Sequence, residues 1–262
     1  MTHKYVSPIG YAGGKFYMLE DIYELVLGNE FDTFIDVFGG SGKVLLNLPV
    51  STLYGSYKCI YNDLDDKMTN FYNVIKNSVG ELIDIVASYN LTDNDINNFS
   101  NRKYYDGLSD TMKAYAMWVN QTYAWSGFGA STYRHKVSQI DINVDYVAKQ
   151  FRMAHNLVKD WEILNLDYND LKYLDGSNVM WYFDPPYKDS DAYYYNFGDN
   201  DYRNLYKFQQ SLEGQYLMNI DEDQYIKFIF GKPNMVKKYR NLMTKPQYPS
   251  DREEWFYWKF YH

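Results

Sequence analysis

The feature that most constrains the fold is an alternation of apolar runs around one glycine-rich turn, between residues 33 and 63. Residues 33–38 (TFIDVF) form a run of strand length and lead into the turn 39–42 (GGSG). A helical pattern follows, and a second apolar run, residues 57–61 (YKCIY), ends close to an acid, Asp63. Strand, tight turn, helix and parallel strand form the repeating unit of a doubly wound sheet. We therefore predict an α/β fold with helices on both faces of an open sheet.

Further strands are predicted after a long interruption. They occupy residues 161–166, 178–183, 215–220 and 253–260. The interruption has mostly helical periodicity, with apolar residues such as Met112, Ala116 and Val119 on one face. We therefore divide the chain into a sheet domain, residues 1–78 and 159–262, and an inserted, mainly helical subdomain, residues 79–158.

Cysteine and histidine content limits the chemistry. The chain of 262 residues has one cysteine, Cys59, and four histidines. One thiol cannot form an internal disulfide framework, and so few His and Cys ligands argue against a zinc site. No apolar run is long enough to span a bilayer, and no signal peptide opens the chain. These features predict a cytoplasmic protein without a metal or a membrane partner.

Charge is segregated along the chain. The net charge is −8, which by itself argues against binding to nucleic acid, because phosphates are neutralised by Lys and Arg. Residues 225–245, however, have six Lys and Arg and no acid, and residues 102–136 have five against two acids. Such segments are candidates for contact with phosphates, and the alternative is a solvated basic face. The 30 tyrosines could supply stacking surfaces for bases or reflect a compositional bias.

Three polar features lie where predicted strands end. They are the stretch from Asp36 to Gly42, the acid Asp63, and the stretch 184–187. Ligands of open α/β sheets bind at the carboxyl ends of the strands. Glycines let a ligand approach the backbone, and an acid after the second strand can accept both hydroxyls of a ribose. The first two features therefore favour an adenosine-containing cofactor, although the turn lacks the G-x-G-x-x-G spacing typical of nucleotide-dependent oxidoreductases.

The third feature, Asp184-Pro185-Pro186-Tyr187, can hold an exocyclic amine. An ionised carboxylate only accepts hydrogen bonds, and a proline pair stiffens a backbone whose nitrogens carry no hydrogen. Asp184 and the Pro185 carbonyl can accept the two amine hydrogens, while Tyr187 stacks on the ring. The nitrogen lone pair is then directed at an electrophile. The alternative is a structural turn, because Asp-Pro often opens turns. The coincidence with the two other features favours a site.

Taken together, the motifs resemble the DNA adenine methylase (Dam-type) family of S-adenosylmethionine-dependent amino-methyltransferases. Residues 184–187 resemble its D-P-P-Y motif, and residues 11–15 (YAGGK) resemble W-A-G-G-K. Residues 36–47 (DVFGGSGKVLLN) are similar to E-P-F-x-G-x-G-x-V-x-L-N, and residues 61–76 to a segment containing A-D-I-N-x-D-L-I-N-x-Y. Departures are Tyr11 for Trp, Asp36 for Glu, and Asn120-Gln121 where the family has an N-R pair.

The resemblance implies a Rossmann-like methyltransferase sheet and assigns roles to individual residues. Asp63 would bind the ribose of the cofactor, Lys15 its methionine carboxylate, and Asp167 would lie near its adenine. The residues implied in binding S-adenosylmethionine are Tyr11, Lys15, Asp36, Phe38, Gly39, Gly40, Gly42, Asp63, Asp167 and Asp184. Those implied in acting on the target base are Asp184, Pro185, Pro186 and Tyr187, and those implied in contacting DNA are Asn120, Arg134 and Lys136.

The function implied is methyl transfer from S-adenosylmethionine to adenine N6 in double-stranded DNA. The base would be flipped out of the duplex, and the insertion would be the target recognition domain. Cytosine N4 is the nearest alternative substrate, but Asp184 favours adenine because the family tendency for cytosine is Ser. A catalytically silent DNA-binding relative is a second alternative. A cognate restriction endonuclease is a further partner that the resemblance allows, with the enzyme in a bacterial cytoplasm or in that of a phage host.

Overall fold

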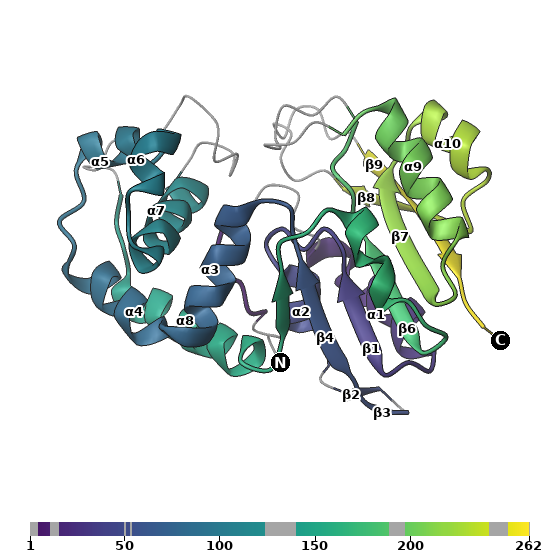
Figure 1. Ribbon diagram of the computed structural model, residues 1–262, viewed down its shortest axis with the longest axis horizontal. Helices are drawn as coiled ribbons and strands as arrows, with labels where there is room; N and C mark the ends of the chain where they lie inside the picture. The colour runs from purple at the N-terminus through teal and green to yellow at the C-terminus, as the bar shows by residue number, and fades with distance from the viewer. Residues whose placement is uncertain are drawn as a thin grey trace.

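The computed structural model describes residues 5–10, 16–49, 51–52, 54–123, 140–188, 197–240 and 251–261. Figure 1 shows two halves, a sheet with its covering helices and a group of helices beside it. The sheet has seven strands in the order β5-β4-β1-β6-β7-β9-β8. Its strands are β1 (Thr33–Asp36), β4 (Lys58–Asn62), β5 (Glu162–Leu164), β6 (Val179–Phe183), β7 (Gln215–Asp221), β8 (Met235–Arg240) and β9 (Asp251–Lys259). A two-stranded hairpin, β2 (Ser51–Thr52) and β3 (Gly55–Ser56), lies apart from it.

The five strands from β5 to β7 are parallel, and β9 pairs antiparallel with both β7 and β8. All six strands expected from apolar runs are present, which confirms the α/β prediction. Strand β8 was not expected, because its sequence MVKKYR is dominated by charge. Lys237 forms an ion pair with Asp21 at 2.7 Å, and Lys238 with Glu253 on β9 at 2.8 Å. Part of the basic segment 225–245 is therefore an edge strand, and its two lysines form ion pairs within the protein.

Helices cover both faces of the sheet, as the alternation of side chains requires. On one face Phe34 and Tyr182 pack towards α1 and α3, and on the other Ile35 and Trp181 pack towards α9. The covering elements are η1 (Phe16–Met18), α1 (Leu19–Leu27), α2 (Lys43–Asn47), α3 (Asp66–Asn77), η4 (Tyr168–Leu174), α9 (Asp199–Gln210) and α10 (Gln224–Phe230). None of the helices in the described ranges has the length and apolar composition needed to span a bilayer.

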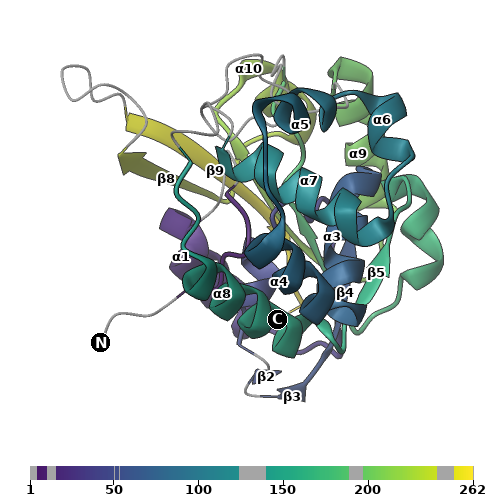
Figure 2. The same cartoon turned by 90° about the vertical axis from the view of Figure 1, so that its left-hand side faces the viewer.

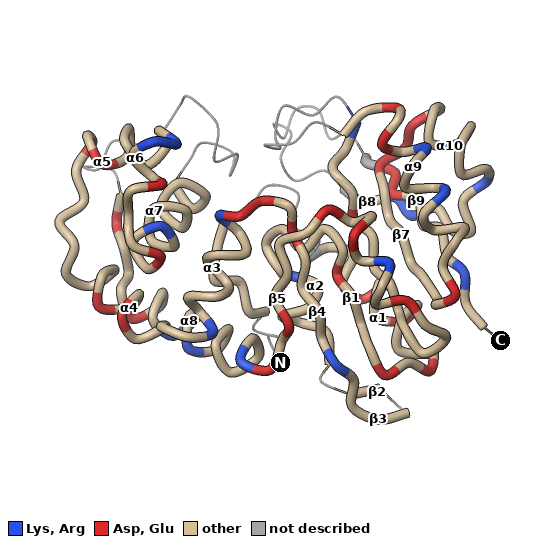
Figure 3. Tube along the Cα trace, viewed as in Figure 1, with Lys and Arg blue, Asp and Glu red and all other residues tan. Residues whose placement is uncertain are grey.

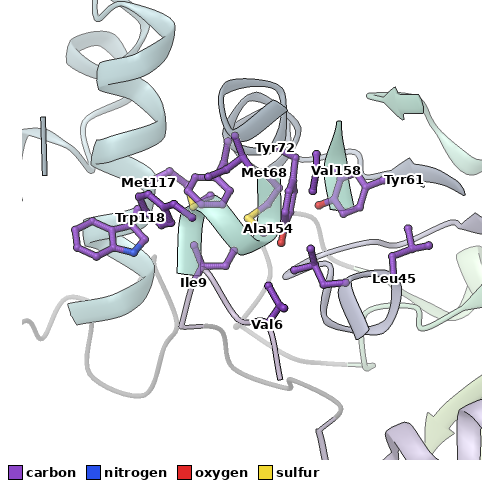
Figure 4. Packing of buried hydrophobic residues seen from close by; sticks show 14 of the residues in the cluster. Val6, Ile9, Leu45, Tyr61, Met68, Tyr72, Met117, Trp118, Ala154 and Val158 are labelled. Carbon is purple, nitrogen blue, oxygen red and sulfur yellow. The ribbon is translucent and has the colours of Figure 1, made fainter. Parts of the chain in front are cut away.

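The helical half contains α4 (Val79–Ser88), α5 (Asp93–Asn98), α6 (Arg102–Asp106), α7 (Asp110–Tyr123) and α8 (Val144–Val158). Figure 2 shows α4, α7 and α8 in front of the sheet. Helix α3 joins the halves, since it packs against α7 and α8. Phe71 of α3 contacts Phe151 of α8, with ring centroids 5.8 Å apart. Figure 4 shows this continuous core, from Leu45 and Tyr61 in the sheet domain to Met117 in α7.

Candidate active site

Adjacent strand ends bring the three sequence motifs together. Strands β4, β1 and β6 are neighbours, and Asp36 is the last residue of β1. Asp63 directly follows β4, and Asp184 directly follows β6. Figure 3 shows acidic residues in the segments at both ends of the strands. The fold brings the carboxylates of Asp63 and Asp184, from distant parts of the chain, within electrostatic range of Asp36.

Asp36 is the most buried of the three acids. It is 2% exposed, and its Oδ1 is buried without a hydrogen-bond partner. Burial raises the pKa of Asp36 well above its usual range, and the nearby carboxylates of Asp184 and Asp63 raise it further. An acid in this position either holds a proton or faces a cation. A bound cationic group would relieve both the burial and the repulsion.

Asp63 holds the glycine turn against the end of β4. Its Oδ2 accepts a hydrogen bond from the Gly40 N–H at 2.7 Å, and its Oδ1 accepts one from the Asp65 N–H at 2.8 Å. The Gly39 N–H donates to the Asn62 carbonyl at 2.8 Å. Burial raises the pKa of Asp63 to about 7, because it outweighs the two backbone donors. The acid that the sequence assigns to a ribose is therefore also part of the glycine turn.

Two buried tyrosines support the turn and explain why it needs glycine. The Tyr61 hydroxyl donates to the Gly40 carbonyl at 2.6 Å, and the Tyr72 hydroxyl donates to the Ser41 carbonyl. A Cβ on Gly39 would lie 2.2 Å from the Tyr61 ring. Gly42 has φ +62°, and a Cβ there would lie 2.6 Å from the Tyr72 hydroxyl. Both tyrosines are fully buried. The sequence reasoning missed this support, because both residues appeared only as apolar positions of a strand and a helix.

Phe38 and Asp167 lie on the η4 side of the site. The half-buried Phe38 ring lies 5.8 Å from the ring centroid of Tyr168 and 5.8 Å from that of Phe197. Asp167 caps η4 by accepting from the Asn169 N–H at 2.9 Å. The Asn62 side chain exchanges two hydrogen bonds of 3.0 Å with the backbone of residue 166, next to Asp167. Asp167 is thereby held close to the end of β4, while its role towards a cofactor stays a prediction.

The Asp184 to Tyr187 stretch is anchored on three sides. Oδ1 of Asp184 accepts from the Asn219 amide at 3.2 Å. The Pro186 carbonyl accepts from the Tyr202 hydroxyl at 2.6 Å. The Tyr187 hydroxyl donates to Oε1 of Glu254 at 3.2 Å. These contacts hold the stretch as a rigid rim at the end of β6.

Glu254 was not singled out from the sequence. It lies on β9, its side chain is fully buried, and its Oε1 also accepts from the Tyr17 hydroxyl at 3.0 Å. Tyr17 belongs to η1, two residues after the N-terminal motif 11–15. A signal existed, since Glu254 directly precedes an apolar run, Trp255 to Tyr257, that is buried on both faces of the sheet.

Only part of the predicted DNA contact can be placed. Asn120 is 9% exposed, and its Nδ2 donates to the Phe99 carbonyl at 3.2 Å. This bond gives Asn120 a structural role between α7 and the end of α5, and its contact with DNA stays a prediction. Four residues predicted to bind cofactor or DNA lie outside the described residues: Tyr11, Lys15, Arg134 and Lys136.

Arg102 of α6 is also engaged within the protein. Arg102 forms ion pairs with Asp66 at 2.6 Å and with Asp106 at 2.8 Å. These side chains are solvent-exposed, so the pairs are weak and can rearrange when a phosphate approaches.

The fold and the site together indicate a class of enzyme. A doubly wound sheet that gathers an acid, a glycine turn and an Asp-Pro-Pro-Tyr rim at neighbouring strand ends is a Rossmann-like methyltransferase domain. Residues 11–252 match the family model of the D12 class N6 adenine-specific DNA methyltransferases, and the chain belongs to this family. It is 27% identical over 257 residues to the type II methyltransferase M.MjaIII of Methanocaldococcus jannaschii, covering 85% of each chain.

Family membership confirms the prediction of an enzyme that methylates adenine N6 in DNA. The cytosine N4 alternative and the silent relative are correspondingly disfavoured. The reaction requires a methyl donor and DNA as the acceptor.

The raised pKa of Asp63 predicts how stability depends on pH. Burial raises the pKa of Asp63 from its ordinary value of 3.8 to about 7, so the folded state keeps a proton that the unfolded state has lost. The resulting stability is fully present below the unfolded pKa and is lost as the pH rises through about 7. Asp36 contributes in the same direction. Thermal unfolding should show a midpoint that falls between about pH 4 and about pH 7 and then levels off, with a smaller slope for Asp63→Asn. Equal slopes for the two proteins would contradict the burial of this carboxylate.

Proposed function

We propose that the methyl donor is S-adenosylmethionine, bound at the carboxyl ends of β1 and β4. The glycine turn 39–42 would lie against its methionine part and Asp63 would accept from its ribose hydroxyls. Asp167 and Phe38 would lie on the adenine side. Tyr11 and Lys15 are proposed ligands from the N-terminal motif, Lys15 at the methionine carboxylate. When bound, the sulfonium group supplies the methyl electrophile, so the proposed reaction needs no metal.

The charge of the site fits a cationic cofactor. Asp36 has a buried oxygen without a hydrogen-bond partner, and the ion pairs among the described residues include neither Asp36 nor Asp63. Both acids have raised pKa values, which means that their ionised forms are destabilised. A sulfonium or an ammonium group placed among them would offset this cost. The same acids would repel an anionic nucleotide, so they favour S-adenosylmethionine over a dinucleotide.

The target adenine would be held by the Asp184 to Tyr187 rim after flipping from the duplex. Asp184 and the Pro185 carbonyl would accept the two N6 hydrogens, and Tyr187 would stack on the ring. Drawing both hydrogens into the base plane leaves the nitrogen lone pair directed at the methyl group. Pro186, whose carbonyl accepts from Tyr202, would keep the turn fixed. The proton released from N6 would pass to Asp184 or to solvent.

One observation carries this proposal: Asp36, Asp63 and Asp184 meet at three neighbouring strand ends although 148 residues separate the first from the last. Incubating the protein with tritium-labelled S-adenosylmethionine and unmethylated plasmid tests it. Label should enter the DNA, and sequencing for modified bases should locate N6-methyladenine at one recurring sequence. Label in cytosine, or none in DNA when the protein binds the donor, would contradict the proposal.

Variants of Tyr187 test the stacking role. Tyr187→Phe keeps the aromatic face and loses the hydrogen bond to Glu254, so it should retain most of the methylation rate. Tyr187→Ala loses a base-stacking contact of roughly 1–3 kcal/mol and should weaken binding of the flipped adenine by about five- to 150-fold. Fluorescence of 2-aminopurine placed at the target base measures flipping directly. Equal behaviour of the two variants would exclude stacking as the function of Tyr187.

The biological setting is a further part of the proposal. We infer that the helical subdomain, residues 79–158, is the target recognition domain, with Asn120, Arg134 and Lys136 contacting double-stranded DNA. The type II name of the relative supports a modification enzyme that protects DNA from a cognate restriction endonuclease. If so, plasmid methylated by this protein should resist cleavage by an endonuclease that recognises the mapped sequence, whereas unmethylated plasmid should be cut.

A further inference from the structure

The pairing of β6 with β7 places Asn219 beside Asp184. In the parallel register Tyr182 lies opposite Leu217 and Phe183 lies opposite Met218. The next residues along the two strands are Asp184 and Asn219, so they lie abreast. Side chains alternate between faces, and Tyr182, Asp184 and Asn219 therefore share one face of the sheet. An apolar residue at position 219 would suit this buried face, yet the chain has an amide there.

Both the oxygen and the nitrogen of the Asn219 side-chain amide form hydrogen bonds. The side chain is fully buried. Its Oδ1 accepts from the Tyr182 hydroxyl, and its Nδ2 donates to Oδ1 of Asp184 at 3.2 Å. An ionised carboxylate can only accept, so the amide nitrogen must face Asp184 and the amide oxygen must face the tyrosine. Tyr182 thus sets the orientation of the amide, and the amide sets the orientation of the carboxylate.

We propose that Asn219 is a positioning residue for methyl transfer, which holds the Asp184 carboxylate in its ionised form and aims its Oδ2 at the target amine. The inference rests on the proposed role of Asp184 towards adenine. Asn219 touches neither base nor cofactor in this arrangement, and it acts through Asp184. The hydrogen bond from the Tyr182 hydroxyl keeps the Asn219 amide from rotating.

The charges around Asp184 explain why a fixed donor is needed. The carboxylate of Asp36, at the end of β1, interacts electrostatically with Asp184, and it also interacts with Asp63 at the end of β4. Among the described residues, the hydroxyl of Tyr182 lies on this side, bonded to Asn219, and the hydroxyl of Tyr72 interacts with Asp36 and Asp63. Neighbouring carboxylates favour protonation of one another, and a protonated Asp184 would offer a donor to an amine that also donates. A hydrogen bond from Asn219 favours the charged form and opposes this effect.

The test is a pH profile of single-turnover methylation at saturating S-adenosylmethionine and DNA. Asn219→Leu removes both hydrogen bonds at similar volume. We expect the rate near neutral pH to fall about tenfold to a hundredfold, and the acid limb of the profile to move to higher pH. Asn219→Asp keeps the shape but sets a second carboxylate against Asp184, so its acid limb should move further. Tyr182→Phe removes the hydrogen bond that orients the Asn219 amide, and it should lower the methylation rate by a smaller factor.

Gln209→Met is the matched control. Gln209 is a fully buried amide on α9 that donates to the sulfur of Met218 at 3.3 Å, on the opposite face of β7. Its replacement removes a buried amide without touching Asp184, and the pH profile should not move. Cofactor affinity, measured by calorimetry, should stay within about twofold of wild type in all four variants.

The outcomes are distinguishable. An unmoved acid limb in both folded Asn219 variants overturns the inference, as does a loss of rate that Gln209→Met reproduces. A wild-type protein that fails to methylate DNA refutes the proposed function instead. If Asn219→Leu does not fold, Asn219→Asp decides the question, because it preserves the shape of the side chain.

Discussion

We expect Asp184→Asn to lower the rate of a single methylation turnover by about 10²- to 10³-fold at saturating cofactor, with little change in duplex affinity. The amide introduced at position 184 can still accept from Asn219 through its oxygen, 3.2 Å away in the wild type. Its nitrogen then points at the target amine. Both groups donate hydrogen bonds, so the contact is repulsive. The negative charge that draws the N6 hydrogens is also lost.

Rapid-quench measurement at saturating donor and DNA isolates the chemical step from binding. Asp175→Asn is a suitable control, because Asp175 is an acid of the same sheet domain, paired with Lys172 at 2.7 Å, that contacts none of the motifs. It should leave the rate unchanged even if it lowers the unfolding temperature. Full activity of Asp184→Asn would remove the catalytic role of the Asp-Pro-Pro-Tyr rim.

Much of the fold was predictable because strands in this chain are apolar and uninterrupted. The parallel strands β1, β4 and β6 are buried at most of their positions, and such runs are recognisable without an alignment. Strand β8 was not predictable on this basis, because its lysines are compensated by Asp21 and Glu253, which are remote or on the partner strand. Helix α9 was missed for a similar reason, since its buried Tyr202, Leu205 and Phe208 are embedded in a polar segment.

The residues of the site likewise fall into a group that could be predicted from the sequence and a group that could not. Residues that a ligand would touch form contiguous motifs, so Asp63 and Asp184 could be named from the sequence. Residues that hold those motifs in place lie on other strands and helices. Tyr72 reaches the glycine turn across 31 positions, Asn219 reaches Asp184 across 35, and Glu254 reaches Tyr187 across 67. Only the register of the folded sheet brings these pairs together.

We expect Asp63→Ala to lower affinity for S-adenosylmethionine by about tenfold to a hundredfold, since hydrogen bonds to a charged group contribute roughly 1.5–3 kcal/mol. Two causes contribute, because Asp63 is proposed to accept from the ribose and also holds the Gly40 N–H at 2.7 Å. Calorimetry with S-adenosylhomocysteine and its 2′-deoxy analogue separates them. The wild type should prefer the ribose form, and Asp63→Ala should bind both equally if the ribose contact is real. If the preference survives in the variant, Asp63 acts through the glycine turn alone. Asp66→Ala is the control, because Asp66 pairs with Arg102 at 2.6 Å on the surface and should bind both ligands as the wild type does.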